Sequence, residues 1–96
     1  MHFVTLLKFT NQGLAAIGDT TLRARKFQEI AAEAGVNVRE MLWTQGRYDG
    51  VVVFDAQDAE SASAAMLHLS SDGYVQTETL MAFDNEAMER VIGKTK

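Results

Sequence analysis

Alternating apolar and polar positions predict four strands along the chain. The segments His2–Phe9 and Tyr48–Asp55 carry apolar residues on both alternating faces, which is typical of central strands covered on both sides. The segments from Val36 to Trp43 or Thr44 and from Tyr74 to Phe83 mix polar residues among their apolar ones. These two segments are therefore predicted to lie at the edges of the sheet.

Apolar residues at spacings of three and four predict helices between the strands. One helix is expected to begin at Asp19 or Thr20 and to run to Ala34, and a second is expected to begin after the capping residue Asp58. Each is followed by a glycine, Gly35 or Gly73, which favours the left-handed conformation that commonly ends a helix. A short third helix after Asp84 or Asn85 has an apolar stripe of Ala87, Met88, Val91 and Ile92. Between the first strand and the first helix, residues 10–13 predict a loop or a short helical turn.

The order of these elements predicts an α+β domain with the ferredoxin-like βαββαβ plan and an extra C-terminal helix. Right-handed crossovers would place the two apolar strands in the middle of an antiparallel four-stranded sheet. The chain has 96 residues, no proline and no linker-like segment, so a single domain over residues 1–96 is expected.

One face of such a sheet has no helix over it, because both crossover helices pack on the other face. The two central strands nevertheless present Val4, Leu6, Val51 and Val53 on one face and apolar residues on the opposite face as well. The C-terminal helix is too short to cover this surface alone. An exposed apolar face of this size predicts an isologous homodimer or a higher homo-oligomer.

Composition excludes several classes of function. The net charge is −4, and the only basic cluster, Arg23, Arg25 and Lys26, is expected on a solvated helix face where it pairs with Glu29 and Glu33, so no nucleic-acid partner is predicted. Cysteine is absent, which excludes disulfides and thiolate catalysis. The chain shows neither a signal-peptide pattern nor a membrane-spanning apolar run, and a cytoplasmic protein is the expectation.

The stretch from Met41 to Phe54 concentrates the rarest side chains. If Gln45-Gly46 forms a two-residue turn, Trp43 and Tyr48 become direct cross-strand neighbours. Such a pair is either an aromatic wall for a ligand or an ordinary stabilising pair, and a shift of one residue in register would send Trp43 to the opposite face.

The same stretch resembles a known protein family. Gly46-Arg47-Tyr48-Asp49-Gly50 with the following valines is similar to the signature of the GYD-domain proteins. The likeness extends along nearly the whole chain, through Thr5-Leu6-Leu7-Lys8-Phe9-Thr10 with Gly13, Trp43-Thr44, and Thr77-Glu78-Thr79-Leu80. The resemblance implies a dimeric α/β-barrel of the ferredoxin-like class, in a family without an established activity.

Asp49 and Tyr48 are the candidate catalytic residues. Asp49 follows the turn beside aromatic and basic side chains, where a carboxylate could act as a general base. The alternative is an exposed turn carboxylate paired with Arg47. The candidate ligand-binding residues are the polar and aromatic side chains expected near the hairpin and the open face: Trp43, Arg47, Lys8, Arg39 and Glu78.

A cofactor or metal site is not predicted. Related dimeric barrels include haem-degrading enzymes, and Asn11, Trp43 and His68 could be assigned the corresponding roles. Their spacing differs from that group, however, and His68 lies off the apolar stripe of its helix. His2 has no partner with metal-ligand spacing.

Two hypotheses of function follow. In the first, the protein is an enzyme for a small organic ligand, such as a cofactor-independent isomerase or oxygenase. Its pocket would lie near the hairpin, either between the sheet and the helices or between two sheets. In the second, it is a non-enzymatic assembly or binding module, and the same residues fix hairpin and dimer geometry. Fold alone cannot decide between them.

Overall fold

The computed structural model describes residues 1–96. Along the chain the elements are β1 (His2–Phe9), α1 (Asn11–Ala15), the 3₁₀ turn η1 (Ile17–Asp19), α2 (Thr20–Glu33), β2 (Asn37–Trp43), β3 (Gly50–Asp55), α3 (Ala59–Ser71), β4 (Val75–Ala82) and α4 (Asn85–Gly93).

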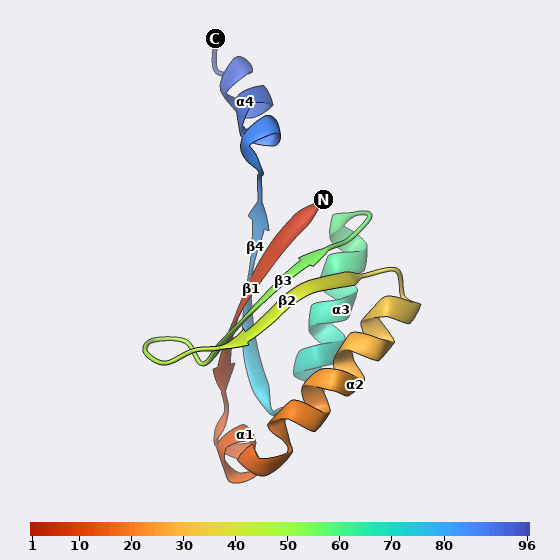
Figure 1. Cartoon of the computed structure of the whole chain (residues 1–96), viewed down its shortest axis with the longest axis vertical. Helices are drawn as coiled ribbons and strands as arrows, with labels where there is room; N and C mark the ends of the chain where they lie inside the picture. Colours follow the sequence, from red (N-terminus) through yellow and green to blue (C-terminus); the bar gives the residue numbers. More distant parts are fainter.

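The four strands form one antiparallel sheet in the order β2-β3-β1-β4. This is the ferredoxin-like order, with the two apolar strands β1 and β3 in the middle and the mixed strands at the edges, as the pattern predicted. Both long helices, α2 and α3, lie on the same side of the sheet (Figure 1).

The core lies between these helices and the sheet. Phe3, Leu7, Val52 and Phe54 of the central strands are buried against α2 and α3, and Phe3 stacks on Phe54 with ring centroids 5.3 Å apart. The helices contribute their apolar stripes to the same cluster, through Phe27, Ala31, Ala62, Ala65 and Met66.

Local signals set the ends of the helices. The Asp58 carboxylate accepts a hydrogen bond from Ser61 N–H, and Asp84 accepts one from Ala87 N–H, each at 2.8 Å, so both predicted caps are confirmed. Asp19 precedes α2 without making a side-chain cap. Gly35 and Gly73 follow their helices with φ of 81° and 84°, the conformation predicted for them.

The opposite side of the sheet has no helix over it. We call it the open face, and define it by six aliphatic residues that recur across all four strands: Val4, Leu6, Leu42, Val51, Val53 and Leu80. Leu42 and Leu80 are 52% and 47% exposed, and the other four side chains are half-buried. The predicted uncovered apolar face is therefore present in the single chain.

The C-terminal helix α4 does not fold back over the open face. It continues beyond the end of β4 and projects away from the sheet (Figure 1), and none of its residues is buried. Its apolar stripe remains accessible, with Met88 at 45%, Val91 at 38% and Ile92 at 48% exposure.

The predicted two-residue hairpin turn is wrong. Trp43 pairs with Gly50 rather than with Tyr48, so residues 44–49 form a six-residue loop that Thr44 N–H closes on the Asp49 carbonyl oxygen at 2.9 Å. Gln is a poor residue for tight hairpin turns, and the longer loop avoids that conformation. The β2–β3 register also shifts at Arg39, which lies at a bulge.

Candidate functional site

Asp49 anchors the β2–β3 loop to the end of β1. Its N–H donates to the Leu7 carbonyl oxygen and its carboxylate accepts from Phe9 N–H, both at 2.8 Å. The carboxylate thus accepts the hydrogen bond of a backbone N–H that has no partner on β3, because the pairing between β1 and β3 ends at Leu7. The expected ion pair between Asp49 and Arg47 does not form, and Asp49 does not line the cavity beside α2.

Replacing Asp49 with alanine is expected to lower the free energy of unfolding by about 1–3 kcal/mol, because the half-buried Phe9 N–H loses its charged acceptor. Chemical denaturation measures this change. Asp19→Asn is the matched control, since the Asp19 side chain makes no capping hydrogen bond, and it should change stability by less than about 0.5 kcal/mol. Equal effects of the two substitutions would contradict the anchoring role.

Tyr48 and Glu78 form a hydrogen bond across one end of the open face. The Tyr48 hydroxyl donates to Glu78 Oε2 at 2.8 Å, so the loop reaches over β1 to β4. This hydrogen bond is the main reason that the pKa of Tyr48 is raised. Lys8 Nζ donates to the Arg47 carbonyl oxygen at 3.0 Å, and the Arg47 guanidinium lies 5.6 Å from the Tyr48 ring centroid. Four of the predicted site residues are therefore brought together here.

Arg39 lies at the opposite end of the open face, in a separate network. Its Nη1 donates to Asp55 Oδ2 at 2.7 Å, and His2 Nδ1 hydrogen-bonds the other Asp55 oxygen. Burial alone would raise the pKa of Asp55, but the hydrogen bonds from Arg39 and His2 outweigh it and hold that pKa below its usual value. His2 Nε2 also lies 3.5 Å from Asp84 Oδ2 at the root of α4.

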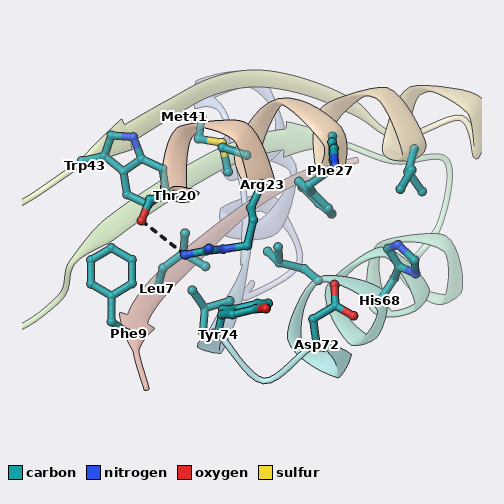
Figure 2. A pocket seen from close by; sticks show the side chains of 15 residues that line it. Leu7, Phe9, Thr20, Arg23, Phe27, Met41, Trp43, His68, Asp72 and Tyr74 are labelled. Atoms are coloured by element: carbon teal, nitrogen blue, oxygen red, sulfur yellow. Dashed lines mark hydrogen bonds between the residues drawn. The ribbon is translucent and has the colours of Figure 1, made fainter. Parts of the chain in front are cut away.

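A cavity lies on the helix-covered side, between α2, the end of the sheet and the start of β4 (Figure 2). Its volume is about 170 Å³ and ten of its fifteen lining residues are hydrophobic. Four aromatic side chains line it: Phe9, Phe27, Trp43 and Tyr74. Trp43, on the same face as Met41, stacks on Phe9 with ring centroids 5.9 Å apart and is 41% exposed.

Arg23 extends into this cavity from α2 (Figure 2). Its Nη1 donates to the Ala16 carbonyl oxygen at 3.1 Å and its Nη2 to Thr20 Oγ1 at 3.3 Å, while its guanidinium carbon lies 4.1 Å above the Tyr74 ring. The expectation that the basic cluster occupies only a solvated helix face is wrong for Arg23, which is half-buried, and no helix ion pair with Glu29 or Glu33 forms.

Of the predicted site residues, only Trp43 lines this cavity; Asp49, Tyr48, Arg47, Lys8, Arg39 and Glu78 do not. The haem assignment is not supported by the geometry. His68 and Trp43 both line the cavity but from opposite ends (Figure 2), and Asn11 is not among its residues. A volume of 170 Å³ is also below the roughly 300–1,000 Å³ of pockets for drug-sized ligands. No group of three or more His, Asp or Glu side chains is arranged to hold a metal ion.

Some of the cavity residues that were not predicted could have been found from their helical spacing. Arg23 lies four positions before Phe27, and Thr20 lies three before Arg23, so both share the buried side of α2. Helical spacing therefore favoured an inward Arg23. Tyr74 had no comparable signal, because its ring position depends on how β4 begins after Gly73.

Two comparisons relate this sequence to known proteins. The profile of the GYD domain family matches residues 3–92. A protein from Thermus thermophilus named "Glutamine synthetase and cystathionine beta-lyase binding protein" is 37% identical over 81 residues, which cover 83% of this chain and 85% of the relative. No helix has the length and apolar character needed to span a membrane.

Proposed function

This chain belongs to the GYD domain family, and from that membership and its open face we propose that it is a protein-binding module that works as a homodimer. The observation that carries the proposal is the aliphatic surface that crosses all four strands without a covering helix. Surfaces of this kind mark interaction sites in soluble proteins.

A second copy of the chain suits the open face because polar groups at its two ends are already paired. Tyr48 bonds Glu78 at one end, and Arg39 bonds Asp55 at the other. An isologous sheet-to-sheet contact could then remove the aliphatic centre from water without leaving these groups unpaired. Four of the six defining residues are β-branched or lie on the central strands, which keeps the surface rigid before association.

The exposed stripe of α4 supports the same occupant. An amphipathic helix is stable when its apolar side is packed, and α4 projects beyond its own sheet. In a dimer packed through the open faces, Met88, Val91 and Ile92 would find apolar cover on the other copy.

The name of the Thermus thermophilus relative supports protein partners for the dimer. We infer that this chain binds metabolic enzymes of the same kinds, a glutamine synthetase or a cystathionine β-lyase. A catalytic role has less support, because the Asp49 carboxylate is engaged by Phe9 N–H and lies outside the cavity.

Sedimentation velocity of the purified chain with glutamine synthetase, and separately with cystathionine β-lyase, from the same organism tests the inferred partners. The expected result is that the chain co-sediments with at least one enzyme and not with an unrelated oligomeric enzyme of similar size. Absence of co-sedimentation with both at tens of micromolar would overturn the inference about these partners, while the oligomeric state is measured independently.

A further inference from the structure

The helix-side cavity combines an aromatic interior with cations that have no carboxylate partner. Arg23 and Lys26 both line it, and neither takes part in any ion pair within 4 Å. Asp72 is the single carboxylate among the lining residues, and the His68 imidazole also lies at the wall. In a chain of net charge −4, this cavity therefore has an excess of positive charge.

Arg23 is held in position but keeps unused donors. A guanidinium has five N–H groups, and those of Arg23 make two hydrogen bonds, to Ala16 and Thr20. Stacking on Tyr74 fixes its plane. Its remaining N–H groups suit a carboxylate, which guanidinium binds with matching planar geometry.

Cavity size limits the apolar part of a ligand. A cavity of about 150 Å³ lined by aliphatic and aromatic side chains accommodates benzene. The present cavity, at about 170 Å³, has room for one ring but not for a fused multi-ring system. The aromatic walls of Phe27 and Trp43 favour a flat ring, because aromatic groups pair by offset stacking or edge-to-face contact.

We propose that this cavity is a binding site for monocyclic aromatic carboxylates, with the ring among Phe27, Trp43 and Leu69 and the carboxylate on Arg23. Lys26 adds a second positive charge from the next turn of helix. The site lies on the helix-covered side, opposite the open face, so its occupancy is independent of the proposed dimer contact.

Trp43 is the only tryptophan of the chain and lines the cavity, so its fluorescence reports binding directly. We expect phenylacetate to produce a saturable change in Trp43 emission. Phenylacetamide, which has the same ring but no charge, should bind about tenfold more weakly or worse, because the charge-assisted hydrogen bond is lost.

Arg23→Gln should weaken phenylacetate by a similar factor of about ten. Arg25→Gln is the matched control, because Arg25 is exposed on the same helix and does not line the cavity, and it should bind as the unmodified chain does. Thermal unfolding of both variants shows whether each is folded. If Arg23→Gln does not fold, the acid-to-amide comparison on the unmodified chain still decides the proposal.

Three results would overturn it. Equal affinities for phenylacetate and phenylacetamide would show that the cavity binds the aromatic ring without recognising the carboxylate. No saturable change with either compound would show that the cavity does not bind single rings. Tighter binding of 2-phenylethylamine, which carries an ammonium group in place of the carboxylate, would show that the cavity selects aromatic amines through Asp72.

Discussion

Replacing Val53 with lysine is expected to convert the dimer into a monomer. Val53 lies on the central strand β3, opposite Val4 on one side and Glu40 on the other, in the middle of the open face. In a single chain the lysine can reach water, so the monomer should stay folded. In the dimer the ammonium group, with Glu40 beside it, would be taken out of water into an aliphatic contact, and this desolvation costs several kcal/mol even for a paired charge. The dissociation constant should rise by at least about a hundredfold.

Light scattering over a range of concentrations measures this change, and thermal unfolding confirms that the variant is folded. Leu22→Lys is the matched control, because Leu22 is an aliphatic residue of α2 that is 44% exposed and lies away from the open face. It should leave the oligomeric state unchanged. If Val53→Lys associates as strongly as Leu22→Lys, the open face is not the contact surface.

Replacing Gly13 with alanine is expected to lower the free energy of unfolding by about 3 kcal/mol or more. A Cβ at this position would lie 2.1 Å from the Tyr74 carbonyl oxygen, a backbone atom that cannot rotate away. That oxygen also accepts the hydrogen bond from Thr10 N–H at 3.1 Å, so relief of the overlap would disturb the contact between α1 and the start of β4. Urea denaturation measures the loss.

Gly18→Ala is the control for this substitution. A Cβ on Gly18 would meet nothing within 4 Å, and the residue does not have positive φ. Its stability should be unchanged or slightly higher, since alanine restricts the unfolded chain. If both variants lose the same free energy of unfolding, the short distance from position 13 to the Tyr74 carbonyl oxygen is not the reason that this position requires glycine.

The sheet order could be predicted from the sequence because burial on both faces leaves a direct pattern. Val51 and Val53 alternate with Val52 and Phe54, and apolar residues on both sides are typical of a central strand that is covered on both faces. The caps Asp58 and Asp84 were predictable for a similar reason, since a capping carboxylate bonds a backbone N–H three residues ahead and depends on no distant contact.

The hairpin could not be predicted to the same accuracy because its partners are distant in sequence. Asp49 is fixed by Leu7 and Phe9, forty or so residues earlier, and Tyr48 by Glu78, thirty residues later. These contacts favour a six-residue loop over a tight turn. Local turn preferences therefore gave the wrong pairing for Trp43.

The candidate site could likewise be predicted only in part. Lys8 and Glu78 lie on neighbouring strands and gather with Tyr48 and Arg47 at one end of the open face. The bulge on β2 places Arg39 with Asp55 at the other end. The lining of the cavity could not be predicted because five separate segments form it: the end of β1, α2, the end of β2, the end of α3 and the start of β4.

If a second copy covers the open face, the unmodified protein in solution has the mass of at least two chains. Sedimentation equilibrium at micromolar concentration should give twice the 10.6 kDa mass of one chain, or a larger even multiple if dimers associate further. A mass of one chain under these conditions would show that no second copy covers the open face.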